Sequence, residues 1–94
     1  MVTAITLMNV ERDKINTVAE QLVDLEGISE VYSVSGRYDL ISVIRVKHNE
    51  ELAEVVTEHI RKIEGIRKTE TLMAFRAYSQ HDLERVFSIG TEEC

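Results

Sequence analysis

The chain has 94 residues, of which 44% are hydrophobic and 30% are charged, and its formal net charge is −6 at pH 7. This length gives one domain, and the composition excludes an intrinsically disordered chain. The acidic balance argues against direct binding of nucleic acid, whose phosphates are bound by basic surfaces. No apolar run approaches the roughly 20 residues of a membrane span, so we expect no membrane partner.

Periodicity predicts six main elements in the order strand, helix, strand, strand, helix, strand. Segments rich in β-branched residues predict strands, and apolar residues at helical spacing predict helices. The strands are predicted over Val2–Val10, Ile28–Ser35, Leu40–Val46 and Ile66–Tyr78. The helical stripes are Ile15, Val18, Ala19, Leu22 and Val23, then Leu52, Val55, Val56, His59, Ile60 and Ile63.

Polar residues and glycines must mark the element boundaries, because the chain contains no proline. Asp13 and Asn49 are predicted to cap the starts of the two helices. Gly27 and Gly65 are predicted to end them, since glycine tolerates the left-handed conformation of a helix terminus.

A short C-terminal helix is predicted within residues 79–94. Ser79–Asp82 resembles a capping box, and Leu83, Val86 and Phe87 follow at helical spacing. We therefore divide the chain into a main domain, residues 1–78, and a tail helix whose role the sequence leaves open.

An internal repeat supports the fold class. The passage Leu25–Ile28 is echoed by Ile63–Ile66, and each copy ends a helix and opens a strand. Two βαβ units in series predict an α+β, ferredoxin-like βαββαβ sandwich with an antiparallel four-stranded sheet. Two helices cover only one face of such a sheet, so we expect the other face to bury itself in a dimer. Its apolar surface is expected from Tyr32, Met73, Phe75 and the tail helix.

The sequence offers no evident catalytic or metal-binding constellation. The three histidines, His48, His59 and His81, show no ligand-like spacing, and the one cysteine, Cys94, stands at the last position. We predict no catalytic residue, no metal and no cofactor. His59 falls on the second apolar stripe, which favours a histidine at the edge of the core over an acid–base group. The single cysteine and the absence of a visible signal peptide predict a cytoplasmic protein.

The turn Gly36-Arg37-Tyr38-Asp39 joins the second and third strands. Backbone amides near a glycine can bind a carboxylate, Asp39 can pair with an ammonium, and Arg37 with a carboxylate. Tyr38 adds a ring and a hydroxyl. These groups suit a free amino acid, although the same residues are common in ordinary hairpin turns.

The segment Val34–Val43, which contains this turn, resembles the Gly-x-Tyr-Asp signature of the Lrp/AsnC effector-binding domain, also called the RAM domain. The passages Leu25–Val31 and Ile63–Thr71 resemble the family's two helix-to-strand passages, including a Thr-x-Thr. The resemblance covers about Val2 to Tyr78.

The resemblance implies a domain that binds amino-acid effectors between subunits and forms dimers that assemble into rings. By motif match, Gly36, Tyr38 and Asp39 would contact the effector, and Thr69 and Thr71 would supply hydroxyls. Arg37 stands at a variable position of the motif. Family regulators carry an N-terminal helix-turn-helix domain, whereas this sequence begins at the first strand. We therefore expect a sensor that modulates transcription of amino-acid metabolism indirectly, alone or assembled with a full-length relative.

Two alternatives remain open from the sequence. One is a cofactor-free enzyme of the dimeric ferredoxin-like barrel type, with His59 as its acid–base group. The other is an oligomeric adaptor without a ligand, in which Gly36–Asp39 is only a turn. The position of a ligand pocket, near His59 or near Gly36–Asp39, separates the first alternative from the sensor.

Overall fold

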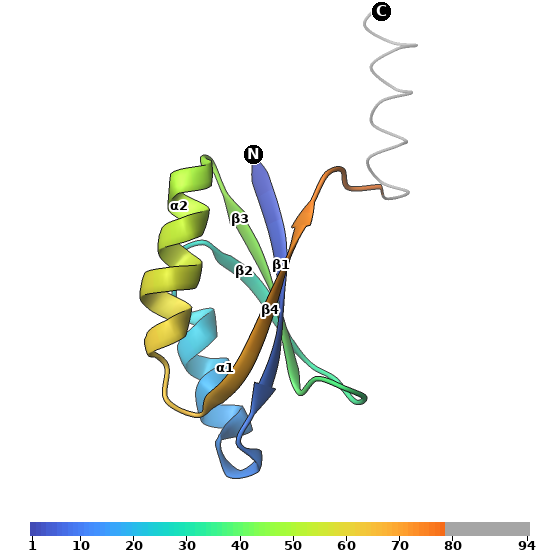
Figure 1. The fold of residues 1–94 in the computed structure, drawn as a ribbon, viewed down its shortest axis with the longest axis vertical. Helices are drawn as coiled ribbons and strands as arrows, with labels where there is room; N and C mark the ends of the chain where they lie inside the picture. Colours follow the sequence, from blue (N-terminus) through green and yellow to red (C-terminus); the bar gives the residue numbers. More distant parts are fainter. Residues whose placement is uncertain (79–94) are drawn as a thin grey trace, which may run out of the picture.

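The computed structural model describes residues 1–78, a four-stranded sheet with two helical segments against one face (Figure 1). The predicted tail helix lies outside the described residues. The elements are β1 (Val2–Val10), the 3-10 turn η1 (Arg12–Lys14), α1 (Ile15–Val23), β2 (Ile28–Ser33), β3 (Leu40–Val46), α2 (Asn49–Glu54), the π-helical turn η2 (Val55–His59), the 3-10 turn η3 (Ile60–Lys62) and β4 (Ile66–Ala74).

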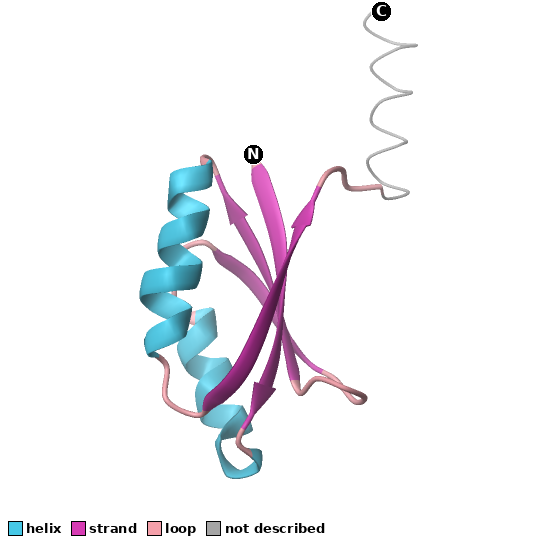
Figure 2. Cartoon of the chain, in the orientation of Figure 1, coloured by secondary structure: helices cyan, strands magenta, loops and turns pink. Residues whose placement is uncertain are grey.

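The strands lie in the order β2-β3-β1-β4, and every neighbouring pair is antiparallel. Figure 2 shows both helical segments on the same side of the sheet. This arrangement confirms the α+β, ferredoxin-like fold that the repeated βαβ pattern predicts.

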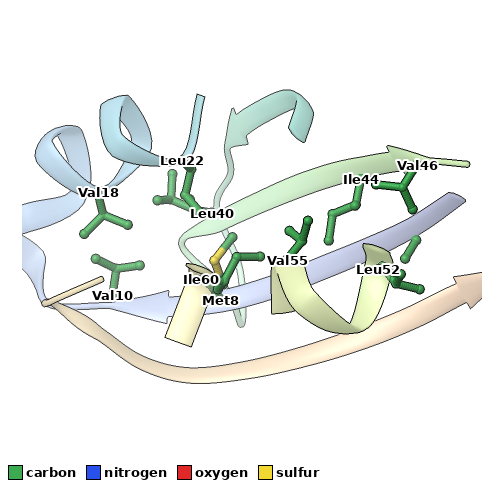
Figure 3. Packing of buried hydrophobic residues seen from close by; sticks show 11 residues of the cluster. Met8, Val10, Val18, Leu22, Leu40, Ile44, Val46, Leu52, Val55 and Ile60 are labelled. Atoms are coloured by element: carbon green, nitrogen blue, oxygen red, sulfur yellow. The ribbon is translucent and has the colours of Figure 1, made fainter. Parts of the chain in front are cut away.

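The core lies between the helices and one face of the sheet (Figure 3). Alternate residues of β1 and β3 point into it, as the period of two requires. The strands contribute Ala4, Met8, Val10, Leu40, Ile44 and Val46, and the helical segments contribute Val18, Leu22, Leu52, Val55 and Ile60. Thr6 and Ser42 are buried in the same layer.

The second helix is not the regular helix that its apolar stripe predicts. A π-helical turn over Val55–His59 interrupts it, and the N–H of Ile60 donates to the carbonyl of Val55. A π-helical turn holds one residue more than a turn of α-helix. Val55 and Ile60, five positions apart, therefore both face the core and are buried. His59 is thereby rotated away from the core and is 46% exposed, so the prediction that it lies at the core edge is wrong.

Strand pairing sets where two strands end. The last residue pairs are Ser33 with Leu40 and Thr3 with Ala74. β2 therefore ends before Ser35, and β4 ends before Tyr78, because the ladders with β3 and β1 stop at these pairs. The predicted strand ends are wrong by two and four residues.

The predicted caps are displaced as well. The 3-10 turn η1 contains Asp13 and precedes α1, whose N-cap residue is Lys14. α2 begins at Asn49 with His48 as its N-cap residue, and the Glu51 carboxylate accepts the N–H of His48 at 3.1 Å. His48 and Glu51 thus form the cap of this helix, and Asn49 is its first residue and not its cap.

The sheet face opposite the helices carries no helix among residues 1–78 (Figure 2). The register with β1 and β3 places Ile5, Leu7, Ile41, Val43, Tyr32 and Leu72 on this open face. Met73 pairs with the buried Ala4 and so lies on the helix-covered face, contrary to expectation. Phe75 follows the last pair of β4 and is 99% exposed.

No helix among residues 1–78 has the length and apolar character needed to cross a bilayer.

Candidate functional site

The loop of residues 34–39 joins β2 to β3 at the end of the sheet away from the N-terminus (Figure 1). The N–H of Val34 donates to the carbonyl of Asp39 at 3.0 Å and closes the loop. Gly36 has a φ of +123°, with open space where a Cβ would stand. Its conformation, and not a lack of room, therefore selects glycine at this position.

Asp39 fastens the loop to β1 through both its backbone and its side chain. Its N–H donates to the carbonyl of Met8 at 2.9 Å, and its Oδ2 accepts the N–H of Val10 at 2.8 Å. The carboxylate thus continues the β1–β3 ladder beyond its last backbone pair, Met8 with Leu40. One oxygen of Asp39 is engaged in the fold, which the sequence analysis did not foresee.

Arg37 is held by its backbone. Its carbonyl accepts the side-chain amide of Asn9 at 2.6 Å, and the residue itself is exposed. The Arg37 guanidinium has no ion-pair partner among residues 1–78, while its main chain lies fixed beside β1.

Tyr38 links the loop to the edge strand β4. Its hydroxyl donates to the Glu70 carboxylate at 2.6 Å. This hydrogen bond, followed by partial burial and the negative charge of Glu70, raises the pKa of the Tyr38 hydroxyl above its ordinary value. The loop and β4, distant in sequence, are therefore adjacent at the open face of the sheet.

Thr69 and Thr71 lie on the other face of β4. They pair across the ladder with Met8 and Thr6, which are both buried beneath the helices. The Thr71 hydroxyl lies 3.4 Å from that of Thr6. Within one chain the structure brings Gly36, Arg37, Tyr38 and Asp39 together with Glu70, and it places the two threonines behind the sheet.

A cavity of about 420 Å³ opens beside Asp39, lined by Asn9, Val10, Asp39, Arg67 and Lys68. The sequence analysis missed Asn9, Glu70, Arg67 and Lys68. The signal was available in part, because an antiparallel sheet in this order places the end of β1 between the loop and the start of β4. Opposite charges meet in this cavity, an arrangement that suits a zwitterion.

A second cavity of about 390 Å³ lies near His59 and includes Glu26 and Glu54 in its lining. His59 Nε2 lies 3.7 Å from Glu54 Oε1, five residues earlier, across the π-helical turn. Both side chains are about half exposed, so neither has the water-excluded setting that tunes an acid–base group. Among residues 1–78, no group of three or more His, Cys, Asp or Glu side chains could hold a metal ion.

Comparison with known proteins identifies the domain. A family model described as the Lrp/AsnC ligand binding domain matches residues 3–83. The HTH-type transcriptional regulator FL11 of Pyrococcus furiosus is 33% identical over 79 residues, which make up 84% of this chain and 52% of that protein. The chain spans between 39% and 52% of the curated transcriptional regulators to which it is similar.

Solved structures agree. The crystal structure of TTHA0845 from Thermus thermophilus has a TM-score of 0.79 and 44% identity, and the match covers 85% of this chain and 100% of that one. E. coli AsnC has a TM-score of 0.77 at 20% identity, covering 84% of this chain and 54% of that one, a likeness of fold alone. The family match, the sequence relatives and the fold together show that this chain belongs to the Lrp/AsnC ligand-binding domain family.

Proposed function

We propose that this chain is an amino-acid-sensing regulatory module that binds its effector at the loop of residues 34–39. The main support for this proposal is the position of that loop. Three side-chain hydrogen bonds hold it against β1 and β4, beside the cavity that Asp39 and Lys68 line. The curated relatives are transcriptional regulators, which supports a regulatory role.

The groups around the loop match those of a free amino acid. One oxygen of Asp39 is held by Val10, and the other is left to meet an ammonium. Arg67 and Lys68 line the same cavity and have no ion-pair partner among residues 1–78, so they are suited to a carboxylate. The exposed Arg37 guanidinium is a further group that can donate hydrogen bonds to the effector's carboxylate. Gly36 and Tyr38 shape the loop and its bridge to β4.

We further propose that the effector site is completed by a second chain. Thr69 and Thr71 lie on the edge strand β4 and on the face away from the loop. Their hydroxyls would then reach an effector held by the loop of a neighbouring subunit and not that of their own chain. Binding and assembly would be linked reciprocally, because the same ligand contacts both chains.

The open sheet face supports a dimer through a contact separate from Thr69 and Thr71, which lie on the opposite face. Tyr32 is 49% exposed and Leu72 is 44% exposed, and both lie beside the apolar residues of β1 and β3 on a face that no helix within residues 1–78 covers. Leu7→Glu places a carboxylate at the centre of this face and is expected to give a monomer by light scattering. Val23→Glu is the matched control, since Val23 is an exposed apolar residue of α1. A Leu7→Glu protein with the mass of the unmodified assembly would contradict this interface.

A thermal-shift screen of the full chain against the twenty amino acids tests the sensor. Ligand at about 100 times its dissociation constant stabilises the folded state by roughly 2.7 kcal/mol, which is several degrees for a domain of this size. We expect a shift with one or a few amino acids. No shift with any of them, for a folded oligomer, would favour the ligand-free adaptor.

A further inference from the structure

A groove between the second helix and the edge strand β4 lies beside the cavity of the proposed effector site and shares Arg67 and Lys68 with it. It has a volume of about 330 Å³, within the range of small-molecule pockets. Its walls come from η2 and η3 on one side and from the first residues of β4 on the other. The groove lies on the helix-covered side of the sheet, away from the open face.

The groove is cationic in an acidic chain. Within residues 1–78 its lining includes Arg61, Arg67 and Lys68 and no aspartate or glutamate, although the chain as a whole has a net charge of −6. None of the three cations has an ion-pair partner among residues 1–78. Like charges at one site repel one another unless an anion lies between them, so this groove is suited to an anionic ligand.

The rest of the lining is apolar or carries a hydroxyl. Ile60 is 1% exposed and forms part of the floor together with Ile66. Thr57 and Thr69 stand at the walls, and the Thr69 hydroxyl can donate to an oxyanion. The Thr57 hydroxyl donates its one proton to the Ala53 carbonyl at 2.6 Å, so Thr69 is left to donate to an oxyanion. A ligand that fills the groove would therefore combine an anionic head with an apolar body.

Two backbone irregularities form the walls of the groove. The π-helical turn η2 supplies Thr57, and Arg67 is the extra residue where the register between β1 and β4 shifts from Asn9 with Lys68 to Val10 with Ile66. π-Helical turns and β-bulges both redirect side chains and are frequent beside binding sites. In this chain they turn Thr57 and Arg67 toward one cavity.

We propose that this groove is a second ligand site, which binds a small carboxylate with an apolar tail. Arg61 and Arg67 hold the carboxylate, Thr69 donates to one of its oxygens, and Ile60 and Ile66 pack against the tail. The groove differs from the cavity beside the loop of residues 34–39, with which it shares Arg67 and Lys68. Thr69, which we propose to reach an effector held by a neighbouring subunit, also lines the groove. It does not depend on amino-acid binding at that loop.

Isothermal titration of the full chain with 4-methylpentanoate at low ionic strength tests the site. We expect saturable binding with a dissociation constant of about 1 mM or tighter. Arg61→Gln and Arg67→Gln should each weaken binding about tenfold, because each removes a charge-assisted hydrogen bond. Lys47→Gln makes the same change of charge at the end of β3 and should leave the dissociation constant unchanged. Arg61 lines the groove and not the cavity at Asp39, so its variant separates the two sites.

Two further ligands test which chemical class the groove binds. Inorganic phosphate alone should bind at least about tenfold more weakly, because it leaves the apolar floor empty, and 4-methylpentylamine should not bind. Hydrogen exchange should show protection of residues 55–69 with 4-methylpentanoate. Absence of saturable binding, equal loss in Lys47→Gln, phosphate binding as tight as the carboxylate, or binding of the amine would each overturn the proposal.

Discussion

The Oδ2 atom of Asp39 accepts the N–H of Val10 at 2.8 Å. This side-chain hydrogen bond extends the pairing of β1 with β3 beyond its last backbone pair. The same residue is the acidic member of the loop that we propose to bind the effector. Asp39 therefore has two roles, and substitutions at this position must separate the stability of the loop from its affinity for a ligand.

Asp39→Ala is expected to lower the free energy of unfolding by about 2 kcal/mol, because it leaves a partly buried N–H without its charged acceptor. Asp39→Asn keeps an acceptor oxygen and should lose about 1 kcal/mol or less. Urea denaturation of the two variants and the unmodified chain gives the comparison. Equal stability of all three proteins would contradict the structural role of the carboxylate.

Tyr38 should titrate above its ordinary pKa. Its hydroxyl donates to Glu70, so the fold favours the neutral phenol. A pKa raised in the folded state contributes stability below the unfolded pKa of about 10, and this contribution is lost as the pH rises through the folded pKa. Ultraviolet absorbance of the phenolate checks the titration.

Glu70→Gln should lower the Tyr38 pKa, because it removes the negative charge beside the phenol while retaining an acceptor oxygen. Tyr38→Phe should remove the alkaline loss of stability that belongs to this residue. Tyr32 also bonds a carboxylate, Glu30, and has a raised pKa, so its signal must be assigned separately with Tyr32→Phe. A Tyr38 pKa unaffected by Glu70→Gln would show that the bridge to β4 is absent in solution.

Gly36→Ala should destabilise the chain by about 1 kcal/mol, since a φ of +123° is strained for a residue with a Cβ although the space is open. Ser35→Ala, at the exposed neighbouring position, is the control and should change stability little. Both values come from chemical denaturation. A Gly36→Ala protein as stable as Ser35→Ala would indicate a different loop conformation.

Removal of the Ser42 hydroxyl is expected to stabilise the folded chain. Its hydroxyl is buried on β3 and has no hydrogen-bond partner among residues 1–78. Ser42→Ala removes an unsatisfied buried group and is expected to raise the free energy of unfolding by about 1 kcal/mol. Calorimetry compares it with Thr6→Val at the neighbouring buried hydroxyl, which contacts Thr71 and should bring no gain. A destabilised Ser42→Ala protein would show that the serine hydroxyl is satisfied in solution.

The strand pattern could be predicted from the sequence because it depends on local alternation. Val2–Val10 and Leu40–Val46 are predicted with their observed ends, since both are central strands that pair along their whole length. The edge strands β2 and β4 were predicted too long, because their ends depend on where the neighbouring strand stops. The end of a neighbouring strand cannot be read from the residues of the edge strand itself.

The regular second helix was predicted wrongly, and the contacts around the candidate site could not be predicted, for related reasons. The stripe that includes His59 assumes a regular helical period, and the π-helical turn changes that period to bury Ile60. The loop of residues 34–39 was recognisable from its residue types. Its links to Asn9, Val10 and Glu70 join segments that only the sheet order brings together, and the separation of Thr69 and Thr71 from the loop follows from the register.

The central claim is that a free amino acid binds at the loop of residues 34–39, and hydrogen exchange of the full chain with each of the twenty amino acids tests it most directly. We predict that at least one amino acid slows exchange in residues 34–39 and at the start of β4. We also predict that Asp39→Asn, while folded, loses that protection. An amino acid that stabilises the chain while leaving exchange in the loop unchanged, or no protection with any of the twenty, would contradict the proposed site.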